Sequence, residues 1–126
     1  MKIERGTIVL VSLDPVHGHE QRGSRPCVVV SDPDVTSHQR FPMLCVVPVT
    51  ATPGTGALYP SLAPGRSGLA KPSFGLVDQL RSIDKRRLLR VFGRITPAEM
   101  GAIETGVCLY LGIEPRPGGI ATPAIQ

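Results

Sequence analysis

Short runs of aliphatic, mostly β-branched residues, separated by prolines, glycines and aspartates, set the limits on how this chain can fold. The run at 26–32 reads PCVVVSD, and the run at 42–50 reads PMLCVVPVT. Such residues fit a pleated sheet, and runs this short between turn-forming residues are typical of buried strands. We therefore predict strands at 7–13, 26–32, 42–50, 58–62, 73–83 and 88–95.

Two residues inside these runs constrain the predicted sheet further. Pro48 cannot donate a hydrogen bond to a neighbouring strand, so it predicts an edge position or a bulge for 42–50. Gly75 predicts a bulge in 73–83. The short run 58–62 is expected at an edge of the sheet, and 82–85 forms at most one helical turn.

One segment near the C-terminus carries the signals of a helix, over 97–111. Thr96 occupies the N-cap position, Pro97 fits the first helical position, and Glu99 completes a T-x-x-E capping box. Gly112 stands where a C-cap glycine belongs. The apolar stripe that should face the core consists of Met100, Ile103, Val107 and Leu111.

These elements predict a mainly β protein: one small antiparallel barrel or curled sheet, closed by a single C-terminal helix. The 126 residues are enough for one domain with a modest core. We place that domain at 1–112. The remainder, 113–126, is rich in proline and glycine without periodicity, and it is expected to be a flexible tail.

Several function classes are disfavoured by what the sequence lacks. Motifs of nucleotide-binding, metal-dependent and serine hydrolases are absent, so no cofactor is expected. The three cysteines, Cys27, Cys45 and Cys108, have no metal-ligand spacing, and they indicate buried, reduced thiols rather than a zinc site. No apolar run reaches the roughly 18 residues of a membrane span, and no secretory segment is evident, so a cytoplasmic protein is expected.

The chain is basic, with a formal net charge of +4 and an isoelectric point near 9.3. This balance favours polyanionic partners such as nucleic acid or an acidic protein. Six cations fall in one short window, where a solvated face and a nucleic-acid surface are equally good interpretations. They are Arg81, Lys85, Arg86, Arg87, Arg90 and Arg94.

The polar stretch GHEQRGSRPCVVVSD, residues 18–32, leads directly into a predicted strand. RNA carries its own nucleophile, the 2′-hydroxyl, so its cleavage needs a base, a cation against the phosphorane and an acid for the 5′ oxygen. Arg25 is the best candidate cation, because its guanidinium forks two phosphate oxygens and keeps its charge. Glu20, His19 and His17 could carry protons. The alternative is a solvated loop in which Arg25 pairs with Glu20 or Asp14.

Four more polar residues are candidates on the predicted strands. Thr50 ends the strand 42–50 and could donate its hydroxyl to a phosphate oxygen. On the strand 73–83, Gln79 and Arg81 should share one face while Asp78 points to the other. Gln79 could read a base edge and Arg81 could bind a phosphate. Their alternative role is the polar side of a half-exposed strand.

The stretches RGTIVLVSLDPVHGHEQRGSRPCVVVSD (5–32), VVPVT (46–50) and DQLRSIDKRRL (78–88) resemble the PemK/MazF family of toxin endoribonucleases. The long D-P-x-x-G-x-E-Q-x-G-x-R-P-x-V-V-V-S pattern makes the resemblance specific. It implies an SH3-like barrel, of the type that CcdB toxins share, and a homodimer. It also implies metal-independent cleavage of single-stranded RNA, leaving 2′,3′-cyclic phosphate and 5′-hydroxyl ends and inhibiting translation. A cognate MazE/PemI-like antitoxin with an acidic segment would cover the RNA groove and join the toxin in binding DNA.

The resemblance also assigns roles to individual residues. The family's catalytic arginine and threonine match Arg25 and Thr50, and its E-Q glutamate matches Glu20. The Kid-like branch adds a histidine and an aspartate, matched by His19 and Asp78. That branch pairs its aspartate with an arginine two residues earlier, where this chain has Leu76. The RNA-groove positions are matched by His17, Gln21, Gln79 and Arg81.

Two other functions stay open at this point. A CcdB-type toxin that poisons gyrase shares the fold and acts by binding a protein. A catalytically inactive module that binds nucleic acid is the second alternative, since Leu76 departs from the Kid-like pair. Discrete RNA fragments ending in cyclic phosphate would separate the nuclease from both.

Overall fold

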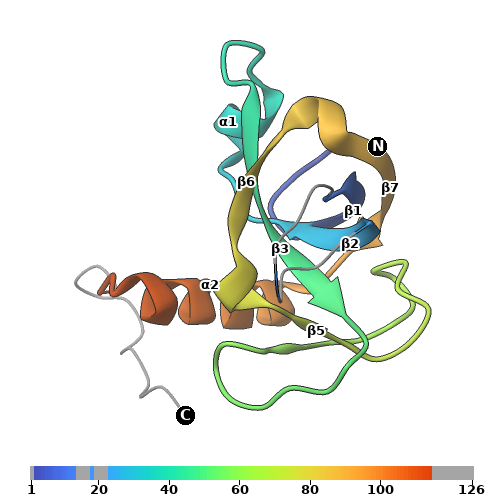
Figure 1. Ribbon diagram of the computed structural model, residues 1–126, viewed down its shortest axis with the longest axis vertical. Coiled ribbons are helices and arrows are strands. Elements are labelled where there is room, and N and C mark those ends of the chain that lie inside the picture. Colours follow the sequence, from blue (N-terminus) through green and yellow to red (C-terminus); the bar gives the residue numbers. More distant parts are fainter. Residues whose placement is uncertain (1, 14–17, 19–22, 115–126) are drawn as a thin grey trace.

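The computed structural model describes residues 2–13, 18 and 23–114, and Figure 1 shows their arrangement. Seven strands and two α-helices follow one another with two single turns of 3-10 helix, η1 and η2, near the middle of the chain. Their order is β1 (Thr7–Ser12), β2 (Ser24–Val29), α1 (Pro33–Ser37), β3 (Met43–Thr50), β4 (Ser61–Leu62), β5 (Ser73–Gly75), η1 (Val77–Gln79), β6 (Arg81–Asp84), η2 (Lys85–Arg87), β7 (Leu88–Arg94) and α2 (Pro97–Leu111).

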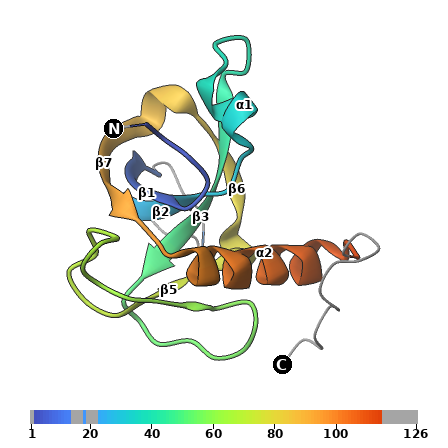
Figure 2. The same ribbon diagram turned by 180° about the vertical axis from the view of Figure 1, so that it is seen from behind.

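The strands form one antiparallel sheet in the order β4-β5-β3-β2-β1-β7, with β6 also paired to β3. The sheet curls into a half-barrel, and α2 lies across one end of it and extends beyond it (Figures 1 and 2). The predicted fold class, mainly β with a C-terminal helix, is confirmed. The short strand predicted within 58–62 is β4, at the edge of the sheet.

Two buried clusters lie on opposite faces of this sheet, as strand alternation requires. One, which we call the helix cluster, packs under α2 and consists of Ile8, Val28, Val47, Val49, Leu62, Leu69, Val77, Ile95, Met100 and Ile103. The other, which we call the inner cluster, lies inside the curl and consists of Val9, Val11, Leu13, Cys27, Val29, Leu44, Val46 and Ile83. Each long strand therefore alternates between two apolar environments, which explains its continuous apolar sequence.

Helix α2 begins and ends as the sequence predicts. The Thr96 side chain accepts from the Glu99 N–H at 3.1 Å, and the Glu99 carboxylate accepts from the Thr96 N–H at 2.9 Å. Gly112 caps the C-terminus in the left-handed region, with φ of 69°. Met100 and Ile103 are buried, but Leu111 is half exposed, so its predicted place on the core stripe is wrong. The helix runs past the sheet before it reaches Leu111 (Figure 2).

Pro48 lies in a strand with neighbours on both sides, so its predicted edge position is wrong. The Pro48 carbonyl accepts from the Leu76 N–H at 2.8 Å. Since the N and O of one strand residue point the same way, the missing N–H faces the gap between β5 and β6. Turn η1 occupies that gap. The hydrogen bond that Pro48 cannot donate is therefore one for which no neighbouring strand offers an acceptor.

The single strand predicted at 73–83 is divided into β5, η1 and β6. The Gln79 N–H bonds the Leu76 carbonyl and the Leu80 N–H bonds the Val77 carbonyl, which closes the turn. Val77 is buried in the helix cluster, so the chain leaves the sheet here to fill the space under α2. The expected helical turn at 82–85 forms three residues later, as η2, because Asp84 caps it through the Arg86 N–H.

Helix α1 is an element that the sequence analysis did not predict. Its signals were present: the Asp32 side chain accepts from the Asp34 N–H at 2.9 Å, and Pro33 occupies the first turn. The Lys85 ammonium donates to the Val35 and His38 carbonyls at 2.6 and 3.1 Å, and so ties the end of α1 to η2. Five residues are too few for periodicity to be visible.

The cysteines agree in part with their predicted burial. Cys27 is buried, whereas Cys45 and Cys108 are partly exposed, and all three are free thiols. Burial raises the pKa of Cys27 to about 12 against the opposing charge of Arg81, so this thiol stays protonated. Within the described ranges, the helices are too short or too polar for a membrane span.

Candidate active site

Arg25 and Thr50 lie on neighbouring antiparallel strands, Arg25 near the start of β2 and Thr50 at the end of β3. The register pairs Cys27 with Pro48 and Val28 with Val47. Continued by two residues along each strand, it sets Arg25 opposite Thr50. Directly opposed residues of an antiparallel pair have their Cα atoms about 5 Å apart. The two residues that the sequence assigned to catalysis therefore lie at the same end of this strand pair, two residues beyond its last bonded pair, Cys27 and Pro48.

Both side chains belong to the face that carries the inner cluster. Arg25 is two residues from Cys27, and Thr50 is four residues from Val46, both members of that cluster. Arg25 is exposed and Thr50 is half-buried, while the cluster residues behind them are buried. The inner face thus ends in a polar rim, with a guanidinium and a hydroxyl above an apolar floor.

Arg81 lies on the same face. It pairs with Val46 across β6 and β3, and it is two residues from Ile83 of the inner cluster. Burial raises the pKa of Cys27, and the positive charge of Arg81 opposes that rise, as a cation on the same face would. Arg25 and Arg81 therefore contribute two cations to one face, as a site for a phosphodiester backbone requires.

Within the described part of the chain, the Thr50 hydroxyl makes one hydrogen bond, and this bond determines which of its hydrogen-bonding positions can still be used by a substrate. Thr50 Oγ1 accepts from the Thr52 N–H at 3.1 Å. A hydroxyl both accepts and donates, so the hydrogen on Oγ1 is left to donate to an incoming oxygen. The turn after β3 therefore orients the hydroxyl as a donor.

Asp78 and Gln79 lie in η1 rather than on a strand, so the predicted alternation of faces from Asp78 to Arg81 is wrong. The Tyr59 hydroxyl donates to Asp78 Oδ2 at 2.5 Å. The other oxygen, Oδ1, is buried and accepts no hydrogen bond from the described residues. Of Asp78, Gln79 and Arg81, which were predicted on one strand, only Arg81 lies on a strand, in the part of β6 that pairs with β3.

Tyr59 was missed by the sequence analysis. It stands in LYPSL, which reads as a short edge strand, and nothing in the chain order indicates a partner in η1. The bond to Asp78 raises the pKa of Tyr59, so its hydroxyl stays protonated and remains a donor at neutral pH.

Four predicted site residues, His17, His19, Glu20 and Gln21, lie outside the described residues. The segment that carries them ends at Gly23, whose carbonyl accepts from the Leu13 N–H at 2.9 Å. This bond extends the pairing of β1 with β2, in which Val11 lies opposite Arg25. The predicted roles of the four residues stay predictions.

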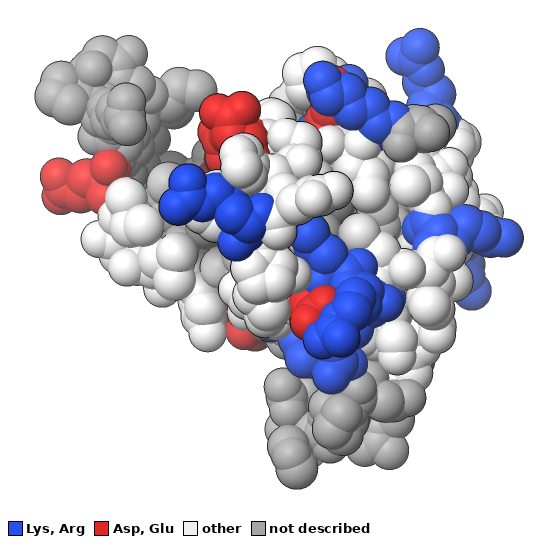
Figure 3. All heavy atoms as spheres, turned by 90° about the horizontal axis from the view of Figure 1, so that it is seen from above, with Lys and Arg blue, Asp and Glu red and all other residues white. Residues whose placement is uncertain are grey.

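The basic window 81–94 is largely engaged in holding the fold together. Arg86 bonds Asp84 at 2.8 Å, Arg94 bonds Glu4, and Arg90 stacks 4.6 Å from the centre of the Phe92 ring. Figure 3 shows basic side chains in several separate places on one face, some of them touching acidic ones. Several cations of this window therefore contact neighbouring side chains of the fold, and Arg81 is the one that lies on the inner face.

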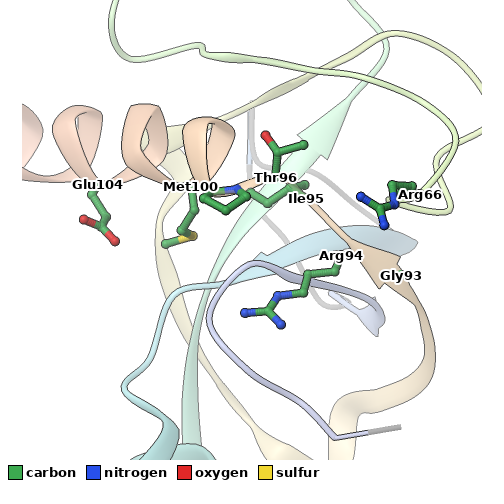
Figure 4. A pocket seen from close by; sticks show the side chains of 8 residues that line it. Arg66, Gly93, Arg94, Ile95, Thr96, Met100 and Glu104 are labelled. Atoms are coloured by element: carbon green, nitrogen blue, oxygen red, sulfur yellow. The ribbon is translucent and has the colours of Figure 1, made fainter.

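A cavity of about 650 Å³ lies between the end of β7 and the first turns of α2 (Figure 4). Arg66, Arg94, Met100 and Glu104 are among its lining residues, and none of the predicted site residues that the structure describes is. Two of its charged side chains are paired with neighbours, since Glu104 bonds Arg5 at 2.8 Å and Arg94 bonds Glu4. The cavity is therefore separate from the Arg25–Thr50 rim.

Comparison with known proteins identifies the family of the chain. Residues 4–111 match the family described as PemK-like, MazF-like toxin of type II toxin-antitoxin system. The chain is 33% identical over 117 residues to endoribonuclease MazF9 of Mycobacterium tuberculosis, covering 88% of this chain and 98% of that protein. It is 39% identical over 110 residues to endoribonuclease PemK of Escherichia coli, covering 82% and 80%. Both relatives belong to the enzyme class predicted from the sequence.

Solved structures show the same fold. A mycobacterial endoribonuclease in complex with its cognate antitoxin superimposes with a TM-score of 0.72 at 23% identity, covering 89% of this chain and 97% of that one. MazF from Deinococcus radiodurans gives 0.71 at 24% identity, covering 86% and 96%. The chain belongs to the PemK-like, MazF-like toxin family of type II toxin–antitoxin systems.

Proposed function

We propose that this endoribonuclease toxin cleaves single-stranded RNA, including mRNA, at the rim formed by Arg25 and Thr50, and so stops translation and growth. The observation that carries the proposal is the register of β2 and β3, which, continued by two residues, sets Arg25 opposite Thr50 on the inner face. A guanidinium and a donor hydroxyl side by side match the oxygens of one phosphodiester. Arg81, on the same face, would hold a neighbouring phosphate.

The chemistry follows from the substrate's own nucleophile. The 2′-oxygen attacks phosphorus as the bond from phosphorus to the 5′ oxygen breaks, which leaves a 2′,3′-cyclic phosphate and a 5′-hydroxyl. The proton of the 2′-hydroxyl goes to a base, and the 5′ oxygen receives a proton from an acid. In this scheme phosphorane charge is stabilised by Arg25 and Thr50, so a bound metal ion is not required.

Arg25 serves here as a charge stabiliser rather than as the acid, since a guanidinium keeps its charge in proteins. The Thr50 hydrogen donates to a phosphate oxygen, because Oγ1 already accepts from the Thr52 N–H. Proton transfer then falls to His19 and Glu20. Asp78 is less suited to it, with one oxygen bound to Tyr59 and the other enclosed.

The expected partners follow from the family. A solved structure of the same fold contains an endoribonuclease with its cognate antitoxin. A net charge of +4 suits an acidic antitoxin segment that competes with RNA for the inner face. A homodimer in the cytoplasm completes the proposal, and the exposed Leu111 and Ile113 at the end of α2 are apolar surface that a second copy could cover.

The test is to incubate the purified chain with a long mixed-sequence RNA, with chelator present, and to map every new end. The proposal predicts discrete cuts with 2′,3′-cyclic phosphate and 5′-hydroxyl ends, absent with Arg25→Ala. Binding without cleavage, unchanged in Arg25→Ala, would identify an inactive nucleic-acid-binding module instead. Intact RNA combined with inhibition of gyrase would identify the CcdB-type activity.

A further inference from the structure

The hydrogen bond between Tyr59 and Asp78 joins two segments that the chain order keeps apart. Tyr59 lies in residues 51–60, which we call the 51–60 connection, between Thr50 of β3 and Ser61 of β4. Asp78 lies in η1, and its Oδ2 accepts from the Tyr59 hydroxyl at 2.5 Å. A bond to a carboxylate is about twice as strong as one between neutral groups. The contact is therefore a firm anchor for the Tyr59 side chain.

The second half of the 51–60 connection is held by other contacts as well. The Leu58 carbonyl accepts from the Val77 N–H at 3.1 Å, and the Pro60 carbonyl accepts from the Gly75 N–H at 2.9 Å. The Ala57 carbonyl packs against α2 where Gly106 leaves room for it. Residues 57–60 are thus fixed to η1, β5 and α2 independently of the Tyr59 hydroxyl.

The first half, residues 51–56, rests on the Tyr59 side chain. A Cβ added to Gly54 would lie 2.9 Å from Tyr59 Cβ and 3.0 Å from Cγ, so the backbone at Gly54 lies directly against this side chain. The Tyr59 N–H also bonds the Gly56 carbonyl at 3.1 Å. At its other end, this half holds Thr50 Oγ1 through the Thr52 N–H.

We propose that Tyr59 is a positioning residue for Thr50. Anchored on Asp78, it supports Gly54 and so keeps residues 51–56 in the arrangement in which Thr52 orients the Thr50 hydroxyl. The inference rests on the proposed function, because it concerns the hydroxyl that donates to the scissile phosphate. Asp78 acts in it through Tyr59 and moves no proton.

The first experiment compares Tyr59→Phe, which removes only the hydroxyl, with Tyr110→Phe, the same change at the half-exposed tyrosine of α2. Single-turnover cleavage of one defined RNA should slow roughly tenfold or more in Tyr59→Phe, the size expected when a reacting group is misplaced. Tyr110→Phe should cleave like the unchanged protein. Equal rates for all three would overturn the proposal.

The second experiment asks whether Tyr59 acts through Thr50. In a Thr50→Val background, Tyr59→Phe should cause no further loss, since the hydroxyl it positions is already gone. A loss as large as in the unchanged background would contradict the proposal. Asp78→Asn keeps an acceptor oxygen for Tyr59 and should slow cleavage less than Asp78→Ala. Equal and complete loss in both would instead assign Asp78 a charge-dependent role in the reaction.

A third measurement does not depend on activity. Hydrogen exchange of the amides between residues 51 and 56 should be faster in Tyr59→Phe than in the unchanged protein, and unaffected in Tyr110→Phe. Unchanged exchange in Tyr59→Phe would mean that the hydroxyl does not hold the connection. If the protein cleaves no RNA, the proposed function is wrong. Faster exchange in Tyr59→Phe would then still show that the Tyr59 hydroxyl holds residues 51–56, but this anchor would have no role in catalysis.

Discussion

Cys27 on β2 and Pro48 on β3 face each other across one antiparallel pair, and the same register continued by two residues sets Arg25 opposite Thr50, at the exposed end of a face that is otherwise apolar. Neither side chain is near the other in sequence, and the pairing of Cys27 with Pro48 sets their register. If β2 and β3 paired one residue out of this register, Arg25 or Thr50 would lie on the opposite face of the sheet, the face that carries the helix cluster. The site therefore depends on this register as much as on the two residues themselves.

Arg25 is predicted to act through the geometry of its guanidinium and not through charge alone. Arg25→Lys keeps the charge but loses the two-pronged contact, so the cleavage rate should fall at least tenfold, and further in Arg25→Ala. The measurement is single-turnover cleavage of a defined RNA. Arg40→Ala, which removes an exposed arginine beyond the opposite end of β3, is the matched control and should keep the full rate. Full activity of Arg25→Lys would refute the bidentate role.

Thr50 is predicted to contribute through its hydroxyl. Thr50→Val keeps the shape and the strand preference but removes the donor, and it should slow cleavage roughly 10- to 100-fold, the range for one hydrogen bond to a charged group. Thr50→Ser keeps the donor and should lose far less. The same RNA assay gives both values, and similar losses in the two variants would point to packing rather than donation.

Gly106 is predicted to be required for the fit of α2 on the sheet. Alanine normally favours a helix over glycine by up to about 1 kcal/mol. A Cβ at Gly106, however, would lie 2.7 Å from the Ala57 carbonyl oxygen and 3.1 Å from Val77 Cγ2. We expect Gly106→Ala to lower the free energy of unfolding by about 1–3 kcal/mol in urea titrations.

Gly101 of the same helix provides the control for this prediction. No atom of the described residues outside the helix's own backbone lies within 4 Å of a Cβ added there. Gly101→Ala should therefore raise the free energy of unfolding by about 0.5–1 kcal/mol. If both substitutions were stabilising, the close approach of α2 to residue 57 would be wrong.

Glu99 is predicted to make stability depend on pH in the acidic range. Burial raises the pKa of Glu99, but hydrogen bonds from the Thr96 and Ala63 N–H groups outweigh it and bring the pKa below its ordinary 4.5. The stabilisation is therefore complete above pH 4.5 and is lost as the pH falls through the lowered folded value. Glu99→Gln should be less stable by about 1 kcal/mol near neutral pH.

The measurement is urea unfolding of both proteins at several pH values. Because glutamine does not titrate, the difference in unfolding free energy should shrink as the pH falls from about 6 to about 3. A constant difference over that range would mean that the carboxylate charge at Glu99 plays no part in holding α2 to residue 63.

The sequence predicts the parts of this molecule that depend on local signals. Four predicted strands and the caps of α2 are confirmed, because short aliphatic runs and capping residues are encoded in adjacent positions. The four strands are those predicted at 7–13, 26–32, 42–50 and 88–95. The division of 73–83 could not be predicted, because it depends on Val77 reaching the space beneath α2. Pro48 was placed at an edge since the sequence does not reveal that η1 lies opposite it.

The candidate site shows the same division. Arg25 and Thr50 are candidates because of their motifs, and their placement at one end of a strand pair depends on a register that the sequence alone does not fix. Tyr59 was not found, because its role depends on a contact with Asp78, nineteen residues away in the chain. The cations of the basic window 81–94 are close together in the sequence, but in the structure they contact different side chains.

The most direct test of the Arg25–Thr50 site is a double-mutant cycle on one defined RNA, with single-turnover rates for the unchanged protein, Arg25→Ala, Thr50→Ala and the double variant. If both residues hold the same phosphate, the double variant should be little slower than the slower single variant, because residues that act as a unit are not additive. If the two losses simply multiply, Arg25 and Thr50 act independently, and the account of a shared phosphodiester site would be wrong.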